Sequence, residues 1–223
     1  MKKPITPQAL QSVDATLHAR YSDRLRQFGH DPRTLGWDTR ENQWQRFGLA
    51  AGSLDFKGRS VLEIGCGLAD FYSYLQEDPE RTPASYTGFD INEDLITACC
   101  EAHRQATFEV RNVLVDTPPK ESWDIVTLFG VLNFRFEEFN NQDFVRRMIE
   151  TAFGLCREAV AVDMLSTICE PTYPKEDFVY YYDPLDMLNF ALSLTPHVQL
   201  RHDQGSIPQR EFLLILRKTP WTP

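Results

Sequence analysis

The sequence predicts an α/β protein whose sheet is mostly parallel and ends in an antiparallel pair of strands. From residue 59 onward, strand-like apolar runs alternate with segments of helical period, a pattern typical of a parallel sheet with helices on both faces. The last two strand-like runs are separated by the short segment DQGSIPQ. Because this segment is too short for a helical crossover, the two strands should be antiparallel neighbours.

The N-terminal part predicts helices only. Apolar residues recur at three- and four-residue spacing over 7–28, which predicts a helix. The segment GHDP at 29–32 ends this helix, and a second helix is predicted over 39–52, with Asp38 or Thr39 as its cap. We therefore expect an N-terminal helical cap over 1–54 and a main domain over 55–223.

The main domain alternates between the two kinds of element. The predicted strands are 60–65, 85–91, 107–113, 123–132, 158–165, 197–202 and 210–218. The predicted helices are 68–78, 92–103, 141–156 and 183–194, with Asn92 as the cap residue of the second. This order predicts a single sheet whose strands are connected mainly by helices.

The composition is that of an ordinary globular chain. Of the 223 residues, 42% are hydrophobic and 25% are charged, and the formal net charge is −9. An acidic excess disfavours nonspecific binding to nucleic acid, which depends on Lys and Arg. No apolar run reaches the roughly 20 residues of a membrane span, and the start, MKKPITPQAL, lacks the apolar region of a signal peptide. We therefore expect a cytoplasmic protein without a membrane partner.

The five cysteines indicate neither a zinc site nor a disulfide framework. They are Cys66, Cys99, Cys100, Cys156 and Cys169. Their number is odd, and no Cys-x-x-Cys pair occurs. We expect reduced thiols and no bound metal.

The segment VLEIGCGLAD at 61–70 points to a ligand. Its strand-like run ends in Gly65-Cys66-Gly67, and glycines let the backbone turn tightly and approach a ligand closely. Open α/β sheets bind ligands at the C-terminal ends of their strands. The next strand-like run ends at Asp90, whose carboxylate is placed to bond a ribose.

The predicted ligand is a nucleoside without a pyrophosphate. The dinucleotide fingerprint requires Gly or Ala three residues after Gly67, where this chain has Asp70. The Lys-Ser/Thr pair of a P-loop does not follow the glycines either. Both observations disfavour an NAD-dependent enzyme or a nucleotide triphosphatase.

Four segments resemble, in order, the motifs of class I S-adenosylmethionine-dependent methyltransferases. VLEIGCGLA resembles the first motif, with Ala69 in place of a third glycine, and YTGFDIN resembles the second, whose acid binds the ribose. FEVRNV resembles the third, with Asn112 where an Asp commonly meets the adenine amino group, and WDIVTLFGVLNF resembles the fourth. The resemblance covers roughly residues 55–218. It implies a Rossmann-like, seven-stranded sheet with an antiparallel last strand, and S-adenosylmethionine as cofactor, released as S-adenosylhomocysteine.

The resemblance also implies which residues contact the cofactor. The expected residues are Glu63, Gly65 and Gly67 beside the methionine part, with Cys66 in the same loop, Asp90 at the ribose, Ile91, Asn112 and Val113 at the adenine, and Phe129 and Gly130 near the sulfonium. Cys66 is expected to fill space beneath the loop rather than to act as a nucleophile. The amide oxygen of Asn112 is expected to accept a hydrogen bond from the adenine.

Two segments are expected to contribute to an acceptor site. One is the helical cap, in which an Arg or Gln could also hold the methionine carboxylate. The other is the Tyr- and Pro-rich segment 166–184, since loops at strand ends commonly carry function. The expected acceptor-binding residues are Tyr21, Trp37, Arg46, Asn133, Tyr173 and Tyr180. The candidates for a catalytic base, which is needed only if the acceptor loses a proton, are Asp163, His197 and His202.

The sequence thus predicts transfer of a methyl group to O, N or C of a small molecule by in-line displacement, in which positioning of the acceptor supplies much of the rate. The fourth motif is not of the Asn/Asp-Pro-Pro-Tyr type, which binds the amino group of a nucleobase or of glutamine. Two alternatives stay open: a regulatory or scaffold protein that keeps the fold without catalysis, and a methyltransferase that acts on RNA or protein. The sequence does not indicate an oligomeric state.

Overall fold

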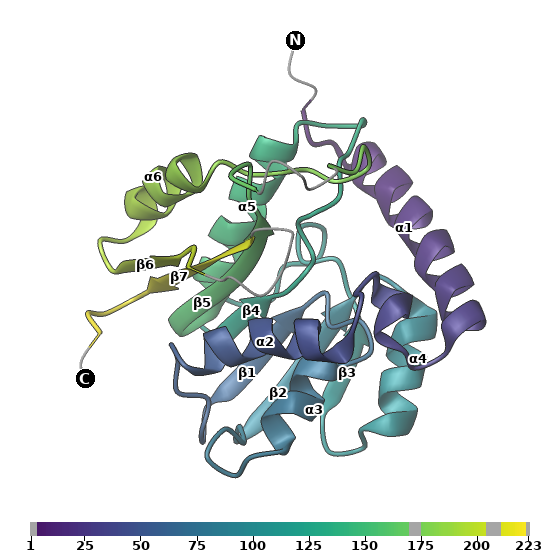
Figure 1. The fold of residues 1–223 in the computed structure, drawn as a ribbon, viewed down its shortest axis with the longest axis horizontal. Helices are drawn as coiled ribbons and strands as arrows, with labels where there is room; N and C mark the ends of the chain where they lie inside the picture. Colours follow the sequence, from purple (N-terminus) through teal and green to yellow (C-terminus); the bar gives the residue numbers. More distant parts are fainter. Residues whose placement is uncertain (1–3, 170–174, 204–210, 222–223) are drawn as a thin grey trace. The chain divides into compact units, whose positions relative to one another are not determined.

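The computed structural model describes residues 4–169, 175–203 and 211–221 (Figure 1). The chain divides into two compact units. The N-terminal unit is Thr6–Thr117, and the C-terminal unit contains Pro118–Pro223. The strand order of the seven-stranded sheet is β3-β2-β1-β4-β5-β7-β6, which confirms the predicted α/β class. The helices expected to form a separate cap over 1–54 fall in the same unit as the first three strands, and the expected boundary at residue 54 stays a prediction.

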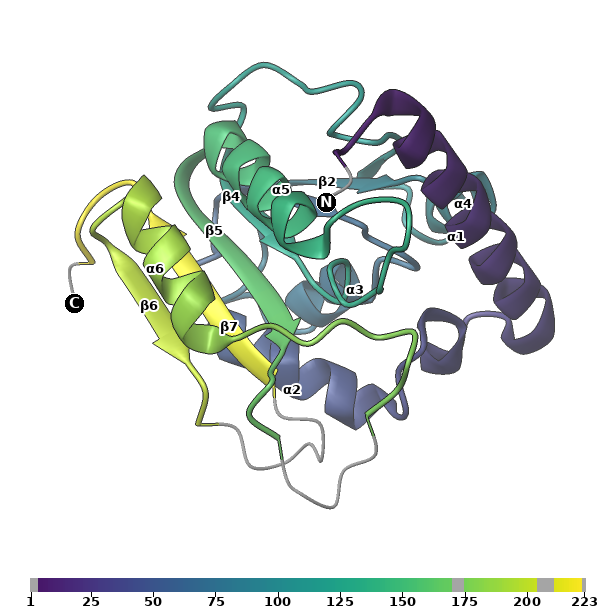
Figure 2. The ribbon, with the colours of Figure 1, turned by 90° about the horizontal axis from the view of Figure 1, so that it is seen from above.

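The N-terminal unit contains three parallel strands in the order β3-β2-β1. Its elements are α1 (Pro7–Phe28), the 3-10 helix η1 (Pro32–Leu35), α2 (Arg40–Ala51), β1 (Ser60–Ile64), α3 (Asp70–Gln76), β2 (Ser85–Asp90), α4 (Glu93–Ala102) and β3 (Thr107–Val110). Helix α1 packs against α4, as both views of the ribbon show (Figure 2). The N-terminal helices are therefore an integral part of this unit.

The C-terminal unit contains the antiparallel element of the sheet. Its elements are β4 (Trp123–Leu128), α5 (Asn141–Leu155), β5 (Cys156–Leu165), α6 (Pro184–Leu194), β6 (Val198–Arg201) and β7 (Glu211–Arg217). Strands β4 and β5 are parallel, whereas β7 is antiparallel to both β5 and β6. The predicted antiparallel pairing of the last two strands is confirmed, and α6 lies over β6 and β7 (Figure 2).

Side-chain caps define where several helices begin. The Thr6 hydroxyl accepts from the Ala9 amide at 3.2 Å at the start of α1, and the Asn92 amide oxygen accepts from an amide of the first turn of α4. Of the two residues predicted to cap the second helix, Thr39 is the cap of α2. Such caps satisfy backbone donors that have no partner inside the helix.

Two predicted strands are shorter in the structure by three or four residues, and one helix was not predicted. Strand β3 ends at Val110 instead of continuing to residue 113, because Asn112 forms a turn in which its side-chain oxygen accepts from the Leu114 amide. Strand β4 ends at Leu128, before the left-handed Gly130. The 3-10 helix η1 begins at Pro32, the last residue of the segment expected to break the first helix, and continues to Leu35.

Aromatic packing against α3 forms much of the core of the N-terminal unit. Phe71 is fully buried, and its ring centroid lies 5.1 Å from that of Phe47 and 5.3 Å from that of Phe56. Phe47 belongs to α2, so this cluster joins α2 to the helix that follows the glycine loop. No helix in the described ranges is both long and apolar enough to span a membrane.

Replacing Phe71 by Ala is expected to lower the free energy of unfolding by about 3–5 kcal/mol, because it removes a fully buried ring and leaves a cavity. Urea unfolding followed by circular dichroism measures the change. Leu192→Ala is the control, since that side chain is 49% exposed and its loss should cost only about 0.5 kcal/mol. Equal effects of the two substitutions would contradict the packing described here.

Candidate functional site

The glycine loop between β1 and α3 makes its backbone hydrogen bonds to the end of β2. The amides of Gly65 and Cys66 both donate to the Phe89 carbonyl oxygen, at 2.7 and 3.0 Å. The Gly67 amide donates to the Asp90 carboxylate at 3.0 Å. A phosphate-binding loop needs its amides directed at the ligand. Because these three amides have partners inside the protein, the loop fits a ligand without phosphate.

Three residues of the loop, each separated by one position, have a left-handed backbone conformation. Their φ angles are 73° at Gly65, 54° at Gly67 and 58° at Ala69. Glycine adopts this conformation without steric cost, whereas alanine there costs roughly 1–2 kcal/mol. Ala69, which takes the place of the third glycine of the motif, therefore keeps the glycine-like conformation.

Asp90 is the centre of the polar contacts at the end of β2. One carboxylate oxygen accepts from the Gly67 amide, and the other accepts from the Asn92 amide at 2.9 Å. Burial raises the pKa of the Asp90 carboxyl, and the backbone hydrogen bonds act in the opposite direction. Each oxygen of an ionised carboxylate has further acceptor capacity, so the group can still accept from the two hydroxyls of a ribose.

Glu63 and Cys66 have side-chain partners inside the N-terminal unit. Glu63 is buried and accepts a hydrogen bond from the Tyr86 hydroxyl. The Cys66 sulfur lies 2.8 Å from the position that a Cβ on Gly88 would take, and a hydrogen bond to Cys99 raises the pKa of the Cys66 thiol. The thiol therefore fills space next to β2, and the expected contacts of both residues with a cofactor stay predictions.

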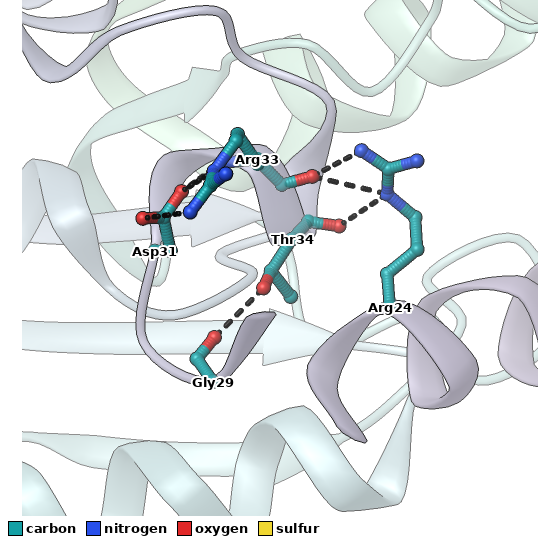
Figure 3. A network of polar contacts seen from close by, with 5 residues as sticks. All are labelled: Arg24, Gly29, Asp31, Arg33 and Thr34. Atoms are coloured by element: carbon teal, nitrogen blue, oxygen red, sulfur yellow. Dashed lines mark hydrogen bonds and ion pairs between the residues drawn. The ribbon is translucent and has the colours of Figure 1, made fainter. Parts of the chain in front are cut away.

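Leu35 covers the glycine loop. A Cβ atom on Gly67 would lie 2.6 Å from Cδ1 of Leu35. Leu35 ends η1, whose position is fixed by the network in Figure 3. There the Arg24 guanidinium donates to the carbonyl oxygens of Arg33 and Thr34, and the Thr34 hydroxyl donates to the Gly29 carbonyl oxygen at 2.7 Å. Sequence analysis did not anticipate this contact, because η1 was not predicted.

Helix α1 is hydrogen-bonded to Asn92, which lies two residues after Asp90. The Asn92 side-chain amide donates to the His18 carbonyl oxygen at 3.0 Å and to the Ser22 hydroxyl at 3.1 Å. Burial raises the pKa of Tyr21 to about 12, and Asp90 is among the charges that act on this hydroxyl. The expected contact of Tyr21 with an acceptor stays a prediction.

Asn112 and Ile91 occupy the predicted adenine side of the site. The Asn112 amide oxygen accepts from the Leu114 amide at 3.0 Å, and its NH2 group donates to both carboxylate oxygens of Asp14. Val113, expected next to the adenine, is 2% exposed, whereas Ile91 is partly exposed. Asp14 of α1 was missed by sequence analysis, since no motif marks it.

Helix α2 presents a cation and an amide near the start of α3. The Arg46 guanidinium lies 4.1 Å from the Trp37 ring centroid, and Arg46 is 5% exposed. The Gln43 amide donates to the Asp70 carboxylate at 2.8 Å. The other atom of that amide, Oε1, is buried without a hydrogen-bond partner among the described residues. A buried acceptor without a partner is costly, and this oxygen retains its capacity to accept a hydrogen bond.

In the C-terminal unit, two predicted residues link the ends of β4 and β5. Asp163 accepts from the Gly130 amide at 2.7 Å, and Asn133 accepts from the Leu165 amide at 3.1 Å. Phe129, which precedes Gly130, is buried. These contacts fix the loop after β4, and the expected roles of the four residues toward a cofactor or acceptor stay predictions.

The other two candidates for a base have different surroundings. The His202 ring nitrogen Nε2 lies 2.9 Å from the hydroxyl of Ser166, which is fully buried at the end of β5. His197 makes backbone hydrogen bonds to Thr195 and Arg217 at the start of β6. His202 therefore has a side-chain partner through which a proton could pass, and sequence analysis did not identify Ser166.

Aromatic side chains gather around the loop after β4. The Phe134 ring packs against Phe136 and Phe178, and the Tyr180 ring centroid lies 4.8 Å from that of Tyr182. Phe178 is 47% exposed. Tyr180 thus packs on Tyr182, whereas Tyr173 lies outside the described residues. Across the residues that the structure describes, no group of three or more His, Cys, Asp or Glu is placed to hold a metal.

Comparison with known sequences identifies the kind of domain. Residues 37–135 match a family model described as a methyltransferase domain. A fatty-acid O-methyltransferase of Mycolicibacterium smegmatis is 40% identical over 86 residues, which are 37% of this chain and 30% of that protein. A phthiotriol/phenolphthiotriol dimycocerosates methyltransferase of Mycobacterium tuberculosis is 38% identical over 78 residues, or 34% of this chain and 28% of that protein. The matches thus span less than a third of these relatives.

Comparison with solved structures identifies the fold. The magnesium protoporphyrin IX methyltransferase of Synechocystis PCC 6803, solved with bound S-adenosylhomocysteine, superposes with a TM-score of 0.67 at 14% identity. The alignment covers 95% of this chain and 100% of that chain. The DhpI complex with S-adenosylhomocysteine gives a TM-score of 0.63, also at 14% identity, over 95% of this chain and 97% of that chain. At this identity the likeness shows the fold alone.

Gly67→Ala is expected to lower the free energy of unfolding by about 1–3 kcal/mol, because the new methyl group meets Leu35 and the φ angle is positive. Gly58→Ala is the matched control, since Gly58 has a φ angle of 69° but no atom within 4 Å of the added Cβ. Urea unfolding of both variants separates crowding from backbone strain. If Gly67→Ala cost no more than Gly58→Ala, the contact with Leu35 would not be restrictive.

Proposed function

We propose that the chain, whose residues 37–135 match a methyltransferase domain, is an S-adenosylmethionine-dependent methyltransferase that transfers a methyl group to an O, N or C atom of a small-molecule acceptor. Bound S-adenosylmethionine supplies a methyl group that is strongly electrophilic because it is carried on a sulfonium. The protein's task is then to bind the nucleoside, to orient the acceptor, and to remove a proton only where the acceptor requires it.

The arrangement at the end of β2 is the observation that best supports this proposal. The loop amides of Gly65, Cys66 and Gly67 have protein partners, so no cradle for a pyrophosphate is left among them. The Asp90 carboxylate retains capacity to accept from ribose hydroxyls. This set of hydrogen-bond donors and acceptors fits a ribose that carries no phosphate.

The amino-acid end of the cofactor is assigned to helix α2 and the start of α3. The Gln43 Oε1 atom and the Asp70 carboxylate are acceptors for an ammonium group, and the Gln43 amide holds Asp70 in place at 2.8 Å. The Arg46 guanidinium provides the charge that a methionine carboxylate requires, and its stacking on Trp37 restricts its orientation. In this proposal Trp37 and Arg46 serve the cofactor, instead of the acceptor expected from the sequence.

For the acceptor, we assign a small molecule with an extended apolar part that carries a carboxylate or hydroxyl. The aromatic cluster that contains Phe134 and Phe178 offers apolar surface in the C-terminal unit, and Tyr180 packs on Tyr182 in the same unit. The two similar sequences are named for a fatty acid and for phthiotriol/phenolphthiotriol dimycocerosates. An acidic, apolar setting is less suited to RNA, which is bound mainly through cations. We place the protein in the cytoplasm.

The nature of the acceptor decides whether a base is used. A carboxylate acceptor is already ionised at neutral pH and needs only to be positioned. An alcohol must lose its proton, and the His202–Ser166 pair is the arrangement in the C-terminal unit that could accept it. Asp163 is the weaker candidate, because one of its oxygens already accepts from the Gly130 amide.

Asp90→Ala is expected to weaken binding of S-adenosylmethionine by about 1.5–3 kcal/mol, the usual contribution of a hydrogen bond to a charged group. Titration calorimetry with S-adenosylmethionine and S-adenosylhomocysteine measures the loss, with NAD as a ligand that should not bind. Asp116→Ala serves as a control, because this carboxylate is exposed and pairs with Arg111. Unchanged affinity in Asp90→Ala would show that the ribose is bound elsewhere.

Incubation with S-adenosylmethionine and fatty acids of increasing chain length tests the acceptor class. We expect formation of S-adenosylhomocysteine and a methyl ester, and a longer apolar chain should lower KM because it buries more apolar surface, at about 0.8 kcal/mol for each buried CH2 group. Tight cofactor binding without turnover of carboxylates or alcohols would instead support a regulatory or scaffold protein.

A further inference from the structure

A carboxylate from α1 reaches the residue that follows β3. The Asn112 amide nitrogen donates to Oδ1 of Asp14 at 3.1 Å and to Oδ2 at 2.8 Å. The Asn112 oxygen is engaged by the Leu114 amide at 3.0 Å. Asn112 thus orients a carboxylate that lies 98 positions earlier in the sequence. The acidic group at this position of the site belongs to α1 and not to β3.

The side of α1 that carries Asp14 is fixed to the ends of two neighbouring strands. Residues 14, 18 and 22 are four apart and lie on one face of the helix. Asn92, just after β2, bonds the His18 carbonyl oxygen and the Ser22 hydroxyl, and Asn112, just after β3, bonds Asp14. Helix α1 therefore runs from the end of β3 to the end of β2 along the proposed nucleoside site.

We propose that Asp14 recognises the 6-amino group of the adenine, an inference that rests on the proposed function. A ribose held by Asp90 at the end of β2 leaves β3 as the neighbouring strand for the base, since β3 lies beside β2 at the edge of the sheet. The Arg111 amide joins the two strand ends by donating to the Asp90 carbonyl oxygen at 2.8 Å. Asp14 is the carboxylate that Asn112 holds at the β3 end.

The chemistry of Asp14 suits an exocyclic amine. An ionised carboxylate has about four acceptor positions, and Asn112 occupies two of them. Asp14 is half-buried, and burial raises the pKa of its carboxyl while the Asn112 hydrogen bond lowers it. A partly desolvated acceptor gains more from an N–H donor than an exposed one does. The 6-oxo group of hypoxanthine would place an acceptor against this carboxylate and should be rejected.

Calorimetric titration with S-adenosylhomocysteine and S-inosylhomocysteine tests the inference, because the two ligands differ at position 6 of the base. The wild-type protein should bind the adenosyl compound at least about tenfold more tightly. In Asp14→Asn the preference should fall to about threefold or less, since an amide can donate to a 6-oxo group. Asp23→Asn is the matched control, because it removes the same charge from an exposed position of α1.

The outcomes separate this inference from the proposed function. Loss of the preference in Asp14→Asn, with the wild-type ratio kept in Asp23→Asn, supports the assignment. An unchanged ratio in Asp14→Asn overturns it and leaves the proposed function standing. Equal affinity of the wild-type protein for both ligands also overturns it, whether or not the variants fold. Failure of the wild-type protein to bind either ligand would contradict the proposed function itself.

Discussion

The contact between the Asp90 carboxylate and the backbone of the glycine loop is the constraint on which the rest of the site depends. The carboxylate accepts from the amides of Gly67 and Asn92. Placing a charge in a partly buried position is costly unless hydrogen bonds compensate it, and these two amides do so without using all of its acceptor capacity. The same contact fixes the loop, because the end of β2 also receives the amides of Gly65 and Cys66. Loop and carboxylate therefore form one preorganised unit.

Asn92 extends this arrangement to the N-terminal helices. Its oxygen caps α4, and its amide nitrogen holds α1 at His18 and Ser22. One side chain thus caps the start of α4 and anchors α1, a helix from the beginning of the chain. Polar networks of this kind specify a single arrangement when every member is satisfied. Through this network α1 is joined to the residues that follow β2.

The sequence predicted the elements well, and it predicted the contacts between them less well. The alternation between strand-like apolar runs and segments with helical spacing identified all seven strands. This works because the spacing of apolar residues reflects which face of a helix or strand is buried. The turn at Gly65 and Gly67 and the position of Asp90 at the end of β2 could be predicted, because both depend on local backbone geometry. Asp14 and Leu35 were missed, since their partners Asn112 and Gly67 lie far away in the sequence. Ser166 was missed for the same reason, because a pair with His202 exists only once β5 and β6 are folded.

The two ends of the proposed reaction are encoded in different parts of the chain. The groups assigned to the nucleoside and the amino-acid end lie within Thr6–Thr117, the unit that contains most of the matched methyltransferase domain at residues 37–135. The aromatic cluster and the His202–Ser166 pair lie in the C-terminal unit. A cofactor of fixed chemistry imposes the same few contacts on every member of a family, whereas each acceptor imposes its own. The N-terminal unit therefore carries motifs that resemble those of the family. The nature of the acceptor depends instead on the aromatic and polar side chains at the strand ends of the C-terminal unit.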